Sequence, residues 1–330
     1  MTPPHFWRGT IDPRSREAAP LTKALLTPFA AIYAWAVARR LARARSHRVA
    51  IPIICVGNLT LGGSGKTPVV AMLRDHIATW ELRVASLSRG YKGSLKGPLR
   101  VDPAIHTASE VGDEPLMLAA RGETWIGADR PAAADAMVAD GVQVIIMDDG
   151  HQNPSLHRDL SLVVLDAGDP FGNGHVFPKG PLREPVSAGL QRANAVVLSG
   201  AGPDPDGNWP CPVLRASIIP TAAPPTGPLV AFAGIGRPQK FFDSLEAVGA
   251  VLAETVPYPD HHTYTARELA WLQTVAQERG ATLITTEKDA VKLPTAFAET
   301  VSVWPIGVEI VPADTLDRLL QTAIGAVSHD

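Results

Sequence analysis

The chain has 330 residues, of which 45% are hydrophobic and 19% are charged, and its formal net charge is -3. These values predict a globular protein with a sizeable core and about two domains, and they exclude a strongly basic, nucleic-acid-binding protein. The two cysteines, Cys55 and Cys211, are far apart and form no Cys-x-x-Cys motif. Neither a disulfide framework nor a thiolate metal site is therefore expected. The N-terminal residues lack the pattern of a signal peptide, so we expect a cytoplasmic location.

The first expected element is an apolar helix. Residues 24–38 carry no charge and include Tyr33 and Trp35. Because a membrane-spanning helix needs about 20 apolar residues, this run is expected to be too short to cross a bilayer. An apolar helix followed by a basic segment is typical of an interfacial membrane anchor, and a buried N-terminal helix with solvent-facing arginines is the alternative. The basic segment contains Arg39, Arg40, Arg43, Arg45 and Arg48.

From residue 49 onwards the pattern changes to alternating strands and helices. Short apolar runs rich in β-branched residues end in glycine or polar residues, and the segments between them have helical periodicity. This alternation predicts a parallel α/β sheet. The expected strands lie within 49–58, 82–90, 142–150, 160–168 and 193–200, and the expected helices begin near Thr67 and Pro131.

The composition shifts near residue 200. Residues 201–228 are dense in proline and glycine, which predicts a linker. Beyond them, further strand patterns and a helical pattern at 266–280 predict a smaller α/β unit. The expected parts are an interfacial helix segment at 1–48, the main α/β domain at 49–200, the linker at 201–228 and a smaller C-terminal α/β domain at 229–330.

The strongest chemical signal is a glycine-rich sequence between the first expected strand of the sheet and the helix after it. It reads Gly62-Gly63-Ser64-Gly65-Lys66-Thr67, with Thr60 where the strict phosphate-loop motif has its first glycine. The glycines let backbone amides approach phosphate oxygens, and the helix directs unpaired N–H groups and the positive end of its dipole towards them. Lys66 is expected to contact the β- and γ-phosphates, and Thr67 to bind magnesium.

A phosphate-loop protein also needs a carboxylate on magnesium at the end of a nearby buried strand. Asp148 and Asp149 follow the apolar run at 142–147. Two adjacent aspartates at such a strand end are costly without a cation, so we expect them to face the metal site. A capped turn is the alternative.

Several other clusters place charged residues in glycine or proline turns, among them GDEP at 112–115. Taken in chain order, VGNLTLGGSGKTP, LSRGYKG, VGDEP, MDDGHQ, GPLREP, AFAGIGRPQKFF, YPDHHTY and TTEKDAVKL resemble the tetraacyldisaccharide 4'-kinases of lipid A synthesis. The resemblance runs from about residue 49 to residue 293. It implies a phosphate-loop parallel-sheet domain joined to a smaller α/β domain, with an N-terminal helix at the membrane. It also explains Thr60, because the phosphate loop of this family ordinarily lacks the first glycine.

The resemblance implies an ATP- and Mg²⁺-dependent reaction. The γ-phosphate passes to the 4'-hydroxyl of an acylated disaccharide 1-phosphate lipid at the cytoplasmic face of the bacterial inner membrane. Lipid and membrane surface are thus the implied partners, without nucleic acid or a known protein partner.

The resemblance also implies roles for individual residues. Asp113 would be the base for the sugar hydroxyl, oriented or tuned by His261, and Lys66 would act on the phosphates. Thr60 and the loop from Gly62 to Thr67 would hold the nucleotide. Magnesium would be held by Thr67, Glu114 and Asp148, and the site would be lined by Asp149, Gln152, Arg183 and Glu184.

Two positions depart from the family pattern: Asn153 stands where histidine is frequent, and His175 where arginine is frequent. Which of His261 and His262 acts stays open, as do the acyl-chain preference and the oligomeric state. The main alternative function is a phosphate-loop regulatory ATPase acting on a protein partner at the membrane. Leu61 counts against it, because such proteins often carry lysine there. A GTPase is disfavoured because TTEKD lacks the [NT]-K-x-D spacing, and a non-catalytic nucleotide sensor is a further alternative.

Overall fold

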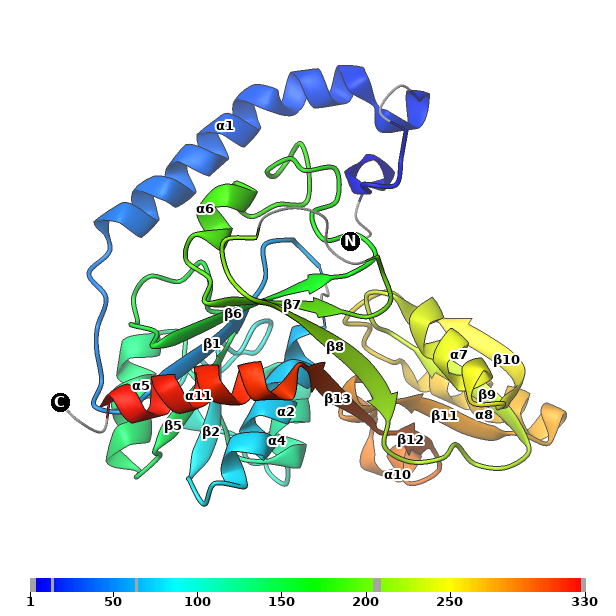
Figure 1. The fold of residues 1–330 in the computed structure, drawn as a ribbon. Helices are drawn as coiled ribbons and strands as arrows, with labels where there is room; N and C mark the ends of the chain where they lie inside the picture. The colour runs from blue at the N-terminus through cyan, green and yellow to red at the C-terminus, as the bar shows by residue number, and fades with distance from the viewer. Residues whose placement is uncertain (1–3, 13–14, 63–64, 204–208, 328–330) are drawn as a thin grey trace.

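The computed structural model describes residues 4–12, 15–62, 65–203 and 209–327. Within these ranges the chain forms a nine-stranded sheet and a four-stranded sheet, which lie side by side with helices packed on them (Figure 1). The expected α/β fold with a large, mostly parallel sheet and an N-terminal apolar helix is confirmed.

The nine-stranded sheet has the order β13-β8-β7-β6-β1-β5-β2-β4-β3, with β1 at its centre. All neighbouring strands are parallel except β13 beside β8 and β3 beside β4. The central strands are buried along their whole length, as expected for apolar strands covered on both faces. The strands are β1 (Ile53–Gly57), β2 (Val84–Ser88), β3 (Leu99–Arg100), β4 (Thr124–Ile126), β5 (Val144–Asp148), β6 (Leu160–Asp166), β7 (Ala195–Ser199), β8 (Val213–Pro220) and β13 (Ile306–Val311).

Helices cover both faces of this sheet. Because side chains alternate along a strand, Ile54 and Val56 of β1 pack into one apolar layer and Ile53 and Cys55 into the other. The first layer contains α2 (Lys66–Ala78), α4 (Asp113–Arg121) and α11 (Ala313–Val327), and the second contains α5 (Arg130–Ala139). Helix α6 (Val186–Leu190) packs in a separate apolar cluster with β6 and β7. The short α3 (Ala108–Val111) directly precedes α4.

The four-stranded sheet is parallel and has the order β10-β9-β11-β12. Phe232 and Val230 of β9 pack against one helix, and Leu229 and Ala231 pack against another on the opposite face. The strands are β9 (Pro228–Ala233), β10 (Val251–Pro257), β11 (Thr282–Thr286) and β12 (Ser302–Trp304). The helices are α8 (Ala266–Arg279) on the first face and α7 (Pro238–Ala247) on the second, together with the short α9 (Glu287–Ala290) and α10 (Thr295–Ala298).

The sheets divide the chain differently from the expected linker and C-terminal domain. Strand β8 lies inside the expected linker 201–228 but belongs to the nine-stranded sheet. The apolar run at 301–310 is broken by Pro305, with β12 in the small sheet and β13 back in the large one. The proline- and glycine-rich composition marks turns around β8, and it does not exclude a strand between them.

The apolar N-terminal helix α1 (Pro20–Arg43) has 24 residues, more than the uncharged run because it includes charged residues at both ends. It is long and apolar enough to cross a membrane by length and composition, so the expectation that it is too short was wrong. The alternative of a buried helix is also wrong, because Ala30 and Val37 are its only buried described residues. Figure 1 shows α1 running apart from the sheets, above α6. Its large exposed hydrophobic residues are Leu21, Leu25, Phe29, Ile32 and Trp35.

Candidate active site

The phosphate loop connects the central strand β1 to helix α2, which begins at Lys66. Gly65 caps this helix with φ of 81°, and a Cβ there would lie 2.9 Å from the Ser199 hydroxyl oxygen. Both the positive φ and the close approach favour glycine. Gly63 and Ser64 of the expected loop lie outside the described residues. The described part therefore has the strand–loop–helix context that phosphate binding requires.

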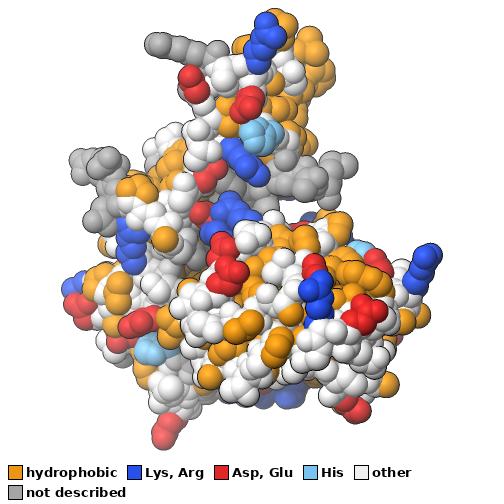
Figure 2. Space-filling view, turned by 90° about the vertical axis from the view of Figure 1, so that its right-hand side faces the viewer, with side chains coloured by type: hydrophobic (Ala, Val, Ile, Leu, Met, Phe, Trp, Pro, Cys, Tyr) orange, Lys and Arg blue, Asp and Glu red, His pale blue; other side chains and the backbone are white. Residues whose placement is uncertain are grey.

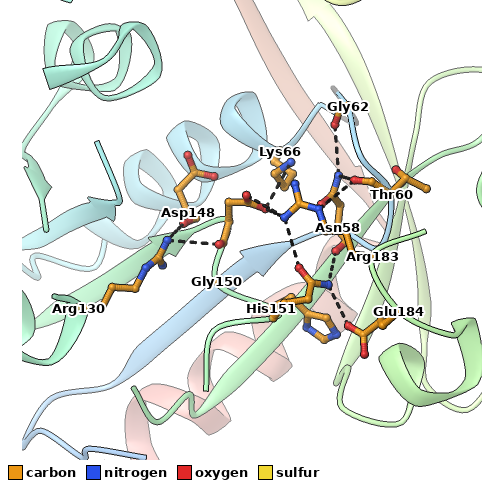
Figure 3. A network of polar contacts seen from close by, with 12 residues as sticks. Asn58, Thr60, Gly62, Lys66, Arg130, Asp148, Gly150, His151, Arg183 and Glu184 are labelled. Carbon is orange, nitrogen blue, oxygen red and sulfur yellow. Dashed lines mark hydrogen bonds and ion pairs between the residues drawn. The ribbon is translucent and has the colours of Figure 1, made fainter. Parts of the chain in front are cut away.

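The loop is tied to the segment before α6. Thr60 forms a β-bridge with Leu182, and its carbonyl accepts hydrogen bonds from the side chains of Asn58 (2.8 Å) and Arg183 (3.2 Å). Figure 3 shows Arg183 pointing from this segment towards Lys66 and the strand end at Asp148. The loop is thus braced from one side by a cation.

Asp149 lies directly after β5, in a left-handed conformation with φ of 49°. Both of its carboxylate oxygens accept from Arg183 Nη1 at 2.9 Å, and Lys66 Nζ lies 3.7 Å from Oδ1. Burial opposes ionisation of this group, but Lys66 and Arg183 outweigh it and lower the pKa of Asp149 to about 2. Asp149 is therefore a carboxylate at neutral pH and holds Lys66 beside the loop.

Asp148 has the opposite environment. Its side chain is only 2% exposed, and Oδ1 has no hydrogen-bond partner among the described residues. Burial, with the negative charge of Glu114 next, raises the pKa of Asp148 to about 7, although Lys66 acts in the other direction. A buried carboxylate oxygen without a partner, close to a second carboxylate, is a fitting ligand for a divalent cation.

The expected magnesium ligands Thr67, Glu114 and Asp148 therefore fit the ion chemically. The described residues contain no group of three or more His, Cys, Asp and Glu placed to hold a metal. Mg²⁺ does not require one, because it usually keeps several waters and takes one or two carboxylates together with substrate phosphates.

Gln152 and Glu184 lie beneath the loop, where both are buried. Gln152 Nε2 donates to the Asn58 carbonyl (2.8 Å) and to Glu184 Oε1 (2.9 Å), and Glu184 also pairs with Arg192 (2.6 Å). Among the expected lining residues, these two therefore brace the loop from below, while Asp149 and Arg183 lie beside Lys66.

Asp113 begins helix α4, so the GDEP motif forms a helix start and not only the expected turn. Its side chain is 8% exposed, and Oδ2 lies 2.7 Å from Nδ1 of His261, which is supplied by the loop after β10 of the small sheet. Burial raises the pKa of Asp113, but the hydrogen bond from His261 and the charge of Lys288 reverse that effect and lower it. The two sheets thus bring together two residues that are 148 positions apart.

His262 faces away from this contact. Its Nε2 lies 3.1 Å from Glu268 Oε1, and its ring stacks on Tyr258 with centroids 4.6 Å apart. Both partners belong to the small-sheet unit. Of the two histidines, only His261 therefore contacts Asp113 in the described structure.

A cavity of about 810 Å³ lies between α1 and the segments at 174–179 and 185–191. Ala30 and Ala34 line it from the helix, and Val186 and Leu190 from α6. His175 and Lys179 add polar groups. This mostly apolar space is open at the surface beside the exposed face of α1.

Comparisons with known proteins show the family of the chain. The profile of the tetraacyldisaccharide-1-P 4'-kinase family (LpxK) matches residues 22–325. The chain belongs to this family. Among curated tetraacyldisaccharide 4'-kinases, the chain is 57% identical to that of Hyphomonas neptunium, over 97% of each chain. It is 48% identical to that of Maricaulis maris, over 99% of this chain and 97% of the relative.

A solved LpxK structure from Aquifex aeolicus, described as an "apo" form in complex with ATP, shares the fold. The TM-score is 0.76 at 28% identity, over 92% of this chain and 99% of the other. The resemblance read from the motifs is therefore confirmed.

The two departures from the LpxK pattern have local explanations. Asn153 accepts hydrogen bonds from the backbone N–H and the hydroxyl of Ser155 and so shapes the turn after the two aspartates. His175 lines the cavity below α1, where burial and the charges of Lys179 and Lys23 lower its pKa. Neither residue contacts the carboxylates of the site through a described hydrogen bond.

Two basic residues near the aspartates were not identified from the sequence. Arg130 is buried, and its Nη2 donates to the carbonyls of Asp148 (3.1 Å) and Asp149 (3.3 Å), so it fixes the turn that carries them (Figure 3). Lys288 follows β11 and lies beside Asp113 and Glu114. Their positions in the sequence could have identified them, because each follows the carboxyl end of a strand in a parallel sheet. Ligand-binding residues are commonly found at these strand ends.

Proposed function

We propose that this protein transfers the γ-phosphate of ATP to the 4'-hydroxyl of tetraacyldisaccharide 1-phosphate in lipid A synthesis. The observation that carries the proposal is the 2.7 Å contact between Asp113 and His261 in a chain of this family. A regulatory ATPase has no acceptor hydroxyl to deprotonate, so it does not need such a carboxylate–histidine pair.

In this proposal Asp113 accepts the proton of the 4'-hydroxyl as the oxygen attacks phosphorus. A sugar hydroxyl is a poor nucleophile at neutral pH, and a positioned general base typically accelerates such a step by roughly 10²–10⁴-fold. His261 orients the carboxylate through Oδ2, while the backbone N–H of Glu114 donates to Oδ1 (3.0 Å). The low pKa of Asp113 keeps it ionised before the reaction.

Lys66 would leave Asp149 for the β- and γ-phosphates when the nucleotide enters, and Arg183 would keep Asp149 paired. Thr67, Glu114 and Asp148 would hold Mg²⁺, which supplies neutralisation of charge on the phosphates. Oδ1 of Asp148 has no hydrogen-bond partner among the residues that the structure describes, which supports this assignment.

We further propose that α1 lies in the membrane interface at the cytoplasmic face of the inner membrane. The exposed residues Leu21, Leu25, Phe29, Ile32 and Trp35 form one stripe on α1, and hydrophobic side chains gather on the projecting part at the top of Figure 2. With 24 residues α1 is about 36 Å long, enough to span the hydrocarbon, but Ala30 and Val37 pack on the protein from its other side. Contact with protein along the helix favours lying on the membrane over crossing it. The cavity below α1 would then receive acyl chains.

The test is product identification with the full-length protein, ATP, Mg²⁺ and tetraacyldisaccharide 1-phosphate in mixed micelles. The expected product carries one new phosphate, at the 4' position. ATP hydrolysis without a phosphorylated lipid would instead support the regulatory ATPase.

A further inference from the structure

Lys288 is a partly buried cation that the roles described so far do not use. It is the second residue of α9, directly after strand β11 of the small sheet, and its side chain is 17% exposed. Its Nζ lies 3.1 Å from Asp260 Oδ1, 3.5 Å from Glu114 Oε1 and 3.9 Å from Asp113 Oδ2. One ammonium group from the small-sheet unit thus meets two carboxylates on the first turn of α4 in the large-sheet unit.

The ammonium group of Lys288 is surrounded by negatively charged side chains. Asp113, Glu114 and Asp260 place three carboxylates together, and adjacent like charges repel each other strongly when they are partly desolvated. Lys66 instead lies 3.7 Å from Asp149. Within the described chain, Lys288 is the only residue that forms an ion pair with Glu114.

Lys292, four residues later, forms its ion pair within the small-sheet unit and not with the large-sheet unit. Its ammonium pairs with the buried Asp289, which also accepts the hydroxyl of Tyr264 (2.9 Å) and the backbone N–H of Gly234 (3.0 Å). All of these groups belong to the small-sheet unit. Lys292 therefore holds its own unit together, whereas Lys288 connects the two units at the site.

His261 and Lys288 come from the same unit and reach the same helix turn. His261 contacts Oδ2 of Asp113, and Lys288 lies between that carboxylate and Glu114. We propose that Lys288 is a positioning residue, which couples the approach of the small-sheet unit to the working orientation of Asp113 and Glu114. The inference rests on the proposed role of Asp113 as base.

The kinetic test compares Lys288→Met, which keeps the side-chain length without the charge, with Lys288→Arg, which keeps the charge. The matched control is Arg279→Met, because Arg279 pairs with Glu254 (3.0 Å) on the surface of the same unit. Lys288→Met should lower kcat about 10-fold or more, with the KM for ATP changed by less than about 3-fold. Lys288→Arg should recover part of the loss, and Arg279→Met should match the wild type.

The second readout is hydrogen–deuterium exchange of the full-length protein without nucleotide or metal. In Lys288→Met, peptides covering 108–121 and 258–265 should exchange faster, while the rest of the small-sheet unit keeps wild-type protection. Faster exchange throughout that unit would mean that Lys288 only maintains the fold, and the coupling would be wrong. Wild-type exchange in both peptides, or a wild-type kcat, would also overturn it.

The two proposals fail in different ways. If Asp113→Asn keeps its activity while Lys288→Met still raises the exchange rates of peptides 108–121 and 258–265, Asp113 is not the base. The positioning of Asp113 and Glu114 by Lys288 is then still supported. If Asp113→Asn is inactive and Lys288→Met behaves like the wild type, the base stands and the positioning role fails.

Discussion

Replacing Asp148 with asparagine is expected to stabilise the metal-free protein and to stop phosphate transfer. Burial and the neighbouring Glu114 raise the pKa of Asp148 from 3.8 to about 7. Each pKa unit corresponds to about 1.36 kcal/mol, so ionised Asp148 disfavours the fold by at most about 4 kcal/mol above pH 7. Because the asparagine amide also has to find partners, we expect a gain of about 1–3 kcal/mol.

The sign of the pH dependence follows from the raised pKa. Between pH 4 and pH 7, roughly, the folded protein keeps a proton on Asp148 that the unfolded chain has lost, so the wild type loses stability as the pH rises. Asp148→Asn removes this loss. Its advantage should therefore be small below about pH 4 and complete above about pH 7.

The assay is urea or thermal unfolding of both proteins between pH 5 and pH 8 with EDTA present. Asp149→Asn is the matched control with the opposite sign, because Lys66 and Arg183 lower the pKa of Asp149 to about 2. Its side chain is 39% exposed, so screening limits the expected destabilisation at neutral pH to about 1 kcal/mol. An Asp148→Asn protein that is less stable than the wild type at pH 8, or a difference that does not change with pH, would refute the reasoning.

Three further predictions concern activity and location. Lys66→Ala should abolish turnover while circular dichroism and the melting temperature stay near those of the wild type, because Lys66 holds phosphates and not a core; near-normal activity would remove the phosphate-loop assignment. Deleting residues 1–45 should move the protein from the membrane pellet to the supernatant, because α1 and its arginines bind the surface together, and an unchanged pellet fraction would place the anchor elsewhere. Asp113→Ala and His261→Ala should each lower kcat, and their combination should lower it less than additively; fully additive losses would show that the two residues do not act as a unit.

The sequence was most informative where local pattern and chemistry coincide. The buried strands β1 and β5 are continuous apolar runs, and the phosphate loop lies between a strand and a helix as its motif requires. In both cases the physical requirement acts within about ten residues. The residues that satisfy it are therefore visible as one segment.

Features that depend on distant parts of the chain were not predictable in this way. The return of β13 to the large sheet requires the pairing of Ile306 with Pro220. The sequence near either residue does not predict this pairing. Likewise, the choice between His261 and His262 is made by Asp113, 148 positions before His261. The length of α1 was underestimated for a different reason: charged residues extend the helix beyond the apolar run that was counted.

The most direct test of the central claim is the steady-state rate of 4'-phosphate transfer by Asp113→Ala at ordinary and at excess magnesium. If Asp113 is the base, kcat should fall by roughly 10²–10⁴-fold, the KM for ATP should stay almost unchanged, and excess magnesium should restore nothing. Recovery of kcat by excess magnesium would contradict the account. It would make Asp113 part of the metal environment and leave Asp149 as the next residue to test.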